Sequence, residues 1–190
     1  MGYVVVVPPT VLKAILLDFG DTLAKEEPVW REDQPDMLTT LIEDADDILD
    51  ELKKTYRLCL ITNTSTSGEE DVRKALREFG IEKYFEVVVS SVDVQSKKPD
   101  SKIFLEALNK LRLKSSEVVM VGNRIDTDIL GANKLGIKSI HYQWNDKYSS
   151  RLDTSYAKPD ATIQCLRDLP KTIAMMDSNP SLRQRIWNNK

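Results

Sequence analysis

The feature of this sequence that most restricts its fold is an alternation between short apolar runs and longer segments of helical period. The runs are rich in Val, Ile and Leu and almost free of charge, which is typical of strands covered on both faces. They predict strands at residues 14–17, 58–61, 87–89, 118–121, 137–141 and 161–163. Because strands that alternate with helices usually pair in parallel, the pattern predicts an α/β chain with a mainly parallel sheet.

The segments between these runs carry apolar residues at the spacing of amphipathic helices. They predict helices at residues 38–52, 68–79, 100–111, 128–135 and 166–176. Gly80 and Gly136 follow two of these segments and fit the left-handed residue that commonly ends a helix.

Length and composition narrow the function classes. The 190 residues fit one domain, which we place at 1–176, followed by a polar tail at 177–190. The formal net charge of −3 argues against nucleic-acid binding by bulk electrostatics. No apolar run approaches the ~20 residues that span a bilayer, and the first residues lack the parts of a signal peptide. We therefore expect a cytoplasmic protein without a membrane partner.

The side chains available for catalysis are limited. The chain has two cysteines and one histidine, too few for a Cys/His zinc site or a disulfide framework. Any chemistry is therefore expected to use carboxylates, hydroxyls, amides and lysine.

Polar residues gather directly after the predicted strands, where open parallel sheets place their ligands. Asp18 follows the first strand, and Thr62 and Asn63 precede a helix start whose free N–H groups favour phosphate. Lys98 precedes another helix, and residues 122–128 bring amide and carboxylate oxygens, the ligands that Mg²⁺ prefers. Each signal alone is explained equally well by a cap or a turn. Together they describe a nucleophile, a phosphate clamp and a metal site on one edge of the sheet.

This combination suits phosphoryl transfer. A phosphate monoester that approaches an aspartate brings like charges together, so a metal ion and a lysine are needed to offset the repulsion. Attack by Asp18 followed by attack of water would divide hydrolysis into two easier steps.

The same residues resemble the four motifs of the haloacid dehalogenase (HAD) superfamily, most of whose members are Mg²⁺-dependent phosphatases. These motifs are an Asp-x-Asp-x-Thr strand end, a Ser/Thr strand end, a lysine ahead of a helix and an acidic loop like Gly-Asp-x-x-x-x-Asp. The resemblance extends over residues 14–142. It implies a Rossmann-like three-layer α/β/α sandwich and a phosphomonoesterase.

The resemblance also implies roles for the matching residues. Asp18 matches the nucleophile that forms an aspartyl-phosphate. Thr62 matches the hydroxyl that holds the phosphate, and Asn63 would add its backbone N–H. Lys98 matches the lysine that neutralises the transferring group.

A Mg²⁺ site is implied by the same motifs. Asp18 and the backbone carbonyl of Gly20 would supply ligands from the first motif. Asn123 and Asp128 stand at the two acidic positions of the fourth motif, with Asp126 between them. Because Asn123 replaces an aspartate and removes one negative charge, we expect weaker Mg²⁺ binding unless Asp126 or Asp128 moves inward.

A second departure concerns acid–base chemistry. The family's phosphatases usually carry an aspartate two residues after the nucleophile, which protonates the leaving oxygen and later activates water. Here that position is Gly20, and an aspartate follows as Asp21. Either Asp21 reaches the site or the acid is absent, and its absence would leave a slow enzyme, because such groups contribute ~10²- to 10⁴-fold.

The substrate is not defined by the sequence. The predicted helices and strands leave no room for the lid domain of many relatives, so we expect a core with no cap or a minimal one. Capless relatives act on large substrates or close the site with a neighbouring subunit, so a phosphorylated small molecule, a phosphorylated macromolecule and a homo-oligomer all stay open. Residues 26–31 could overhang the site, and Trp30 and Trp144 could pack or contact substrate.

Three other functions share parts of this pattern. A receiver domain of a signalling system also places Asp, Thr and Lys at a sheet edge, but its acidic pair precedes the phosphoacceptor, whereas Asp18 comes first here. A dehalogenase lacks the second aspartate, yet the set Thr62, Lys98 and the acidic loop fits phosphate better. The strongest alternative is a catalytically weakened HAD-fold module that binds a phosphorylated ligand or partner.

Overall fold

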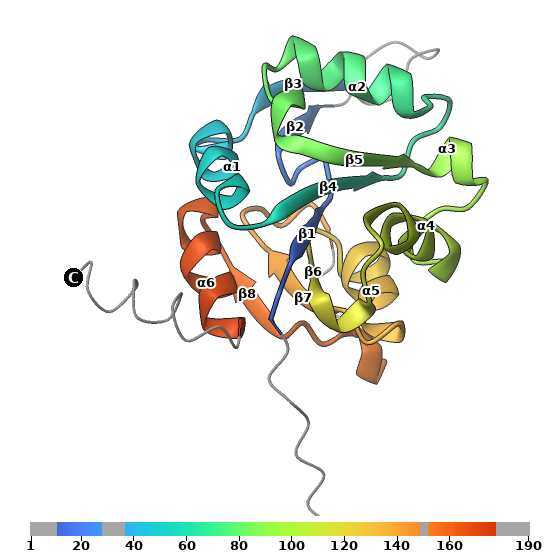
Figure 1. Ribbon diagram of the computed structural model, residues 1–190, viewed down its shortest axis with the longest axis vertical. Helices are drawn as coiled ribbons and strands as arrows, with labels where there is room; N and C mark the ends of the chain where they lie inside the picture. The colour runs from blue at the N-terminus through green and yellow to red at the C-terminus, as the bar shows by residue number, and fades with distance from the viewer. Residues whose placement is uncertain (1–10, 28–36, 149–151, 178–190) are drawn as a thin grey trace, which may run out of the picture.

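The computed structural model describes residues 11–27, 37–148 and 152–177. A six-stranded, all-parallel sheet forms the centre of this part of the chain (Figure 1). In spatial order its strands are β5 (Phe85–Ser90), β4 (Arg57–Thr62), β1 (Ala14–Leu17), β6 (Val118–Gly122), β7 (Lys138–Tyr142) and β8 (Ala161–Ile163). All six strands predicted from the apolar runs are confirmed, close to their expected bounds.

Helices cover both faces of the sheet (Figure 1). One face packs against α1 (Ala45–Lys53), α2 (Glu69–Glu78) and α6 (Leu169–Met176), and the other against α4 (Ser101–Leu111) and α5 (Leu130–Lys134). The short helix α3 (Ser91–Val94) follows β5 directly. In β1, Ile15 and Leu17 enter the first core while Ala14 and Leu16 enter the second, as the two-residue period of a strand requires. The predicted three-layer α/β/α sandwich is therefore confirmed.

The predicted helix at residues 38–52 is wrong in its first part. Residues 37–41 form β3 (Met37–Leu41), which pairs antiparallel with β2 (Ala24–Glu27) in a separate two-stranded sheet. Thr39 and Thr40 are β-branched and suit a strand. Asp44 has a φ of 66°, in the left-handed region that a right-handed helix cannot contain, so the helix begins only at Ala45.

The last described residue, Asp177, contacts the core. Asp177, expected to begin the tail, is fully buried, and its carboxylate accepts hydrogen bonds from the Leu12 N–H (3.4 Å) and the Tyr56 hydroxyl (3.2 Å). It therefore packs with the core, while residues 178–190 and Trp30 lie outside the described residues. Within the described ranges, no helix is long and apolar enough to cross a membrane.

The strand order of the sheet reverses beside β1. The chain runs from β1 outward through β4 and β5, and then returns to the other side of β1 for β6, β7 and β8. Ligands of open parallel sheets bind at such a reversal, beyond the carboxyl ends of the strands. Asp18 is the first residue after β1, and its N–H donates to the Val121 carbonyl of β6 at 3.0 Å.

Candidate active site

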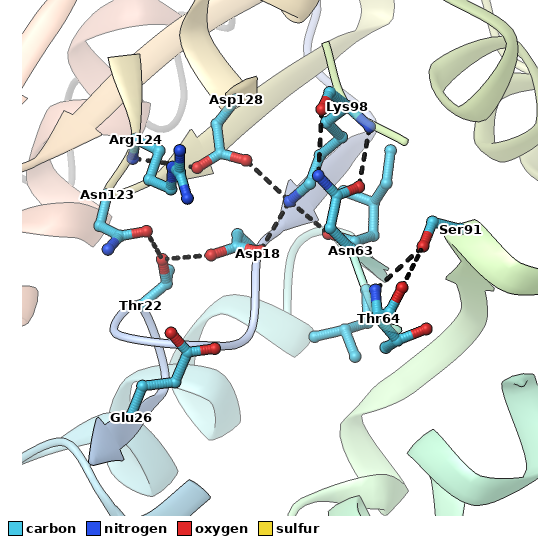
Figure 2. Close-up of polar contacts among 12 residues, drawn as sticks. Asp18, Thr22, Glu26, Asn63, Thr64, Ser91, Lys98, Asn123, Arg124 and Asp128 are labelled. Atoms are coloured by element: carbon cyan, nitrogen blue, oxygen red, sulfur yellow. Dashed lines mark hydrogen bonds and ion pairs between the residues drawn. The ribbon is translucent and has the colours of Figure 1, made fainter. Parts of the chain in front are cut away.

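The centre of the site is a buried lysine between two carboxylates. The Nζ of Lys98 lies 2.6 Å from Oδ1 of Asp18 and 2.7 Å from Oδ1 of Asp128, and it donates to the Ile61 carbonyl at 2.9 Å (Figure 2). All three side chains are buried. Burial alone would lower the pKa of Lys98, but the charges of Asp128 and Asp18 outweigh it and raise that pKa. The cluster thus holds two carboxylates against one ammonium, a balance that favours a further cation.

Asp128 is held rigidly by its own turn. It lies in a π-helical turn over Ile125–Ile129, and its Oδ2 accepts the backbone N–H of Arg124 at 3.0 Å. A Cβ on Gly122 would stand 2.3 Å from that same Oδ2, so glycine at this position leaves the room that the carboxylate fills. The pKa of Asp128 is raised overall, because the effect of burial exceeds the lowering effect of the adjacent Lys98. Turns of this π-helical type occur frequently at functional sites.

Thr22 links the nucleophile candidate to the fourth motif. Its fully buried hydroxyl lies 3.0 Å from Oδ2 of Asp18 and 3.3 Å from Oδ1 of Asn123 (Figure 2). The Thr22 hydroxyl is therefore within hydrogen-bond distance of both the Asp18 carboxylate and the Asn123 amide oxygen. Thr22 is absent from the set of site residues that we predicted, although it is the threonine of the first motif.

Replacing Thr22 by valine is expected to lower the free energy of unfolding by about 1.5–3 kcal/mol, because a buried carboxylate loses a donor. Urea unfolding would measure it. Thr172→Val is a matched control, because the Thr172 hydroxyl donates to an exposed helix carbonyl, that of Asp168. Equal effects of the two substitutions would contradict the hydrogen bond to Asp18.

Two loops of the site are joined by the side chain of Asn63. Its Nδ2 donates to the Lys98 carbonyl at 3.0 Å, and its Oδ1 accepts the Lys98 N–H at 2.8 Å. Beyond it, Thr64 and Ser91 exchange a second pair of hydrogen bonds, at 2.9 and 3.1 Å. These contacts fix the loop after β4 against the segments that follow β5 (Figure 2). Asn63 thus has a positioning role in addition to the backbone role that we expected.

A polar cavity opens above these residues. Its empty space, counted together with adjoining open solvent, amounts to about 390 Å³. Its lining residues are Asp18, Gly20, Glu26, Thr62, Asn63, Lys98, Arg124, Thr127 and Tyr148. The structure thus brings together Asp18, Thr62, Asn63 and Lys98 in the lining of one cavity. Asn123 and Asp128 join them through Thr22 and Lys98, respectively.

Asp126 does not converge with this group. Its two carboxylate oxygens accept from the guanidinium of Arg124 at 3.0 and 2.5 Å, and the side chain is half-exposed. The hydrogen bonds with Arg124 lower the pKa of Asp126. The structure therefore gives no support to Asp126 as a metal ligand.

Asp21 is also turned away from the cavity. One carboxylate oxygen lies 2.8 Å from Nζ of Lys147, and the other accepts the Glu26 N–H at 2.9 Å. Its backbone carbonyl accepts the indole N–H of Trp144 at 2.7 Å, so this tryptophan packs against the turn. Asp21 itself has a φ of 50°. These contacts hold the Asp21 carboxylate outside the cavity and argue against the alternative in which Asp21 replaces the missing acid.

Glu26 is the cavity carboxylate that the sequence did not single out. It lies at the end of β2 and points toward the loop that carries Asp18 (Figure 2). Burial raises the pKa of Glu26, and the charges of Asp18 and Asp21 raise it further. Only the expected overhang of residues 26–31 hinted at its presence.

The donor set fits a hard divalent cation. The ligands predicted from the sequence, the carboxylates of Asp18 and Asp128, the amide oxygen of Asn123 and the carbonyl of Gly20, are all oxygens of the kind that Mg²⁺ prefers. The described residues hold no group of three or more His, Cys, Asp or Glu side chains placed to hold a metal. The absence of such a group among the described residues is expected if an amide and a carbonyl take the place of further carboxylates.

The structure combines a parallel sheet with an aspartate at the point where the strand order reverses, and a lysine joins this aspartate to an acidic turn. These features define the class of this protein. The family model described as "Haloacid dehalogenase-like hydrolase" matches residues 22–142. The chain belongs to this family.

Several proteins of similar sequence are named as phosphatases. N-acylneuraminate-9-phosphatase of Rattus norvegicus is 29% identical over 143 residues, which cover 75% of this chain and 56% of that protein. Pyrophosphatase PpaX of Bacillus velezensis is 32% identical over 141 residues, or 74% of this chain and 62% of that protein. The chain thus spans less than two thirds of either relative. An uncharacterized protein from Listeria monocytogenes serotype 4b superposes with a TM-score of 0.77 and 28% identity, covering 87% of this chain and 98% of that one.

Proposed function

We propose that this chain is a phosphomonoesterase in which Asp18 attacks phosphorus and forms an aspartyl-phosphate. The observation that carries the proposal is the buried Lys98, held 2.6 Å from Asp18 and 2.7 Å from Asp128 beneath a polar cavity. An ammonium so placed fixes the nucleophile and lies where a phosphoryl oxygen would gain charge. The phosphatases among the relatives support the same chemistry.

The chain's own residues account for binding and attack. Thr22 holds one oxygen of Asp18 and Lys98 holds the other, so the carboxylate is oriented before substrate arrives. The Thr62 hydroxyl and the Asn63 N–H would hold the phosphate oxygens, since both residues line the cavity. Donors that are in place before the reaction avoid reorganisation during it.

Mg²⁺ would be held by Asp18, Asn123, Asp128 and the carbonyl of Gly20. It would supply the positive charge that offsets repulsion between the phosphate and the two carboxylates.

The proposal is tested by hydrolysis of an aryl phosphate with and without Mg²⁺, with Asp18→Asn as the blank. We expect turnover that requires Mg²⁺ and disappears on chelation. Wild-type turnover no greater than the Asp18→Asn blank would overturn the proposal and favour the alternative, a module that binds a phosphorylated ligand or partner.

The metal ligands allow a gain-of-affinity test. Asn123→Asp should lower the Mg²⁺ concentration for half-maximal activity about tenfold or more, because a full charge is added beside the cation. A Mg²⁺ titration of activity measures the change. Asn109→Asp adds the same charge at an exposed position of α4 and should leave the Mg²⁺ requirement unchanged. An unaltered requirement in Asn123→Asp would remove Asn123 from the metal site.

A further inference from the structure

Hydrolysis of an ordinary phosphate ester needs a proton donor, because an alkoxide is a poor leaving group. This inference rests on the proposed function and asks which group supplies the proton. Lys98 is bonded to two carboxylates, and Asp21 lies outside the cavity. Arg124 lines the cavity but stays protonated at any working pH. Among the described lining residues, Glu26 is the carboxyl group other than the nucleophile.

The Glu26 carboxylate occupies a defined place beside the nucleophile. A Cβ on Gly20 would stand 2.2 Å from Oε1 of Glu26 and 2.5 Å from its Cδ. The Glu26 side chain therefore fills the space that any side chain at position 20 would enter. Gly20 is two residues after Asp18, and all three residues line the same cavity.

The contacts of Glu26 orient its two oxygens differently. Its Oε2 accepts from the Tyr148 hydroxyl at 3.3 Å and lies 3.8 Å from Nζ of Lys147. Its backbone N–H is fixed by the Asp21 carboxylate. Oε1 is the oxygen nearest to the space above Gly20. One oxygen is thus anchored, while the other lies over Gly20, two residues after Asp18.

We propose that Glu26 is the catalytic acid and base of this site, supplied by the β2–β3 hairpin in place of a side chain at position 20. As Asp18 bonds to phosphorus and the ester P–O bond breaks, the Glu26 carboxyl gives its proton to the leaving oxygen, which departs as the alcohol. The resulting carboxylate then takes a proton from water while that water attacks phosphorus. The bond to Asp18 breaks, inorganic phosphate leaves, and the Glu26 carboxyl is restored.

The first test compares leaving groups. Glu26→Gln should lower kcat/KM for glycerol 2-phosphate about 10²- to 10⁴-fold. For dinitrophenyl phosphate, whose phenolate leaves without a proton, kcat/KM should change little. Glu27→Gln, an exposed carboxylate on the same strand, should leave both values unchanged. Equal losses on the two substrates, or no loss on glycerol 2-phosphate, would overturn the proposal.

The second test moves the carboxylate. Glu26→Ala should lose turnover of glycerol 2-phosphate, and Gly20→Asp in that background should recover much of it. Gly20 is not among the positive-φ glycines, so an aspartate fits its backbone once Glu26 is shortened. Gly20→Asp alone should be impaired, because its side chain meets Glu26. A double variant that has the melting temperature of wild type but recovers no turnover of glycerol 2-phosphate would contradict the proposal that Glu26 takes the place of a side chain at position 20.

The two proposals fail differently. If wild type does not exceed the Asp18→Asn blank on either substrate, the phosphatase function falls and this role falls with it. If wild type hydrolyses both substrates and Glu26→Gln keeps full activity on glycerol 2-phosphate, only the role of Glu26 falls.

Discussion

Replacing Lys98 by methionine should lower the free energy of unfolding by about 3–5 kcal/mol and abolish turnover. The substitution leaves Asp18 and Asp128 buried with no cation between them, and breaking a buried ion pair from one side carries this penalty. Urea unfolding would measure the stability, and aryl phosphate hydrolysis the activity.

Two controls separate charge from packing in that experiment. Lys97→Met changes the exposed neighbouring lysine and should alter stability by no more than about 0.5 kcal/mol. Adding Asp18→Asn and Asp128→Asn to Lys98→Met removes the unpaired charges and should restore most of the lost stability. A triple variant as unstable as Lys98→Met would show that packing of the lysine, not its charge, is the stabilising factor.

Asp18→Asn should reduce turnover by at least about 10⁴-fold while the chain stays folded, because removing a nucleophile costs nearly all of the catalysis. Stability should not fall, since Lys98 keeps Asp128 as a partner and the repulsion between the two carboxylates is relieved. Mass spectrometry of acid-quenched protein gives a direct readout. Wild type should carry a phosphoryl group on the peptide that contains Asp18, and the variant should not.

Asp153→Asn is the matched control for this substitution, because Asp153 is exposed. It should leave both turnover and phosphoryl labelling unchanged. Labelling on a different residue of the wild type would contradict the assignment of the nucleophile even if Asp18→Asn were inactive.

The sheet and the residues after its strands could be predicted because both follow from local pattern. Each buried strand is an apolar run, and parallel pairing carries the residue after every run to the same edge. Asp18 and Thr62 meet for this reason, whereas Lys98 reaches the same cavity from the segment between α3 and α4. The hairpin was missed because the apolar stripe of α1 extends backward in sequence through Leu41, so periodicity alone did not reveal the interruption at Asp44.

The orientation of the acidic side chains could not be predicted because it depends on partners far along the chain. Asp21 is held by Lys147, 126 positions away. Glu26 enters the site only because a two-stranded sheet folds beside Gly20. Neither spacing nor composition reports such contacts. Asp126 has a nearby partner in Arg124, but the choice between this pair and a metal depends on the shape of the turn.

The buried Asp177 carboxylate connects segments of the chain at one edge of the sheet. It joins the segment entering β1, through Leu12, to the residue before β4, through Tyr56, at the edge opposite the cavity. Burial and the neighbouring Asp177 carboxylate raise the pKa of Tyr56, which keeps its hydroxyl a donor. The hydrogen bonds of Asp177 therefore connect the segments ahead of two strands at an edge that carries none of the described residues lining the cavity.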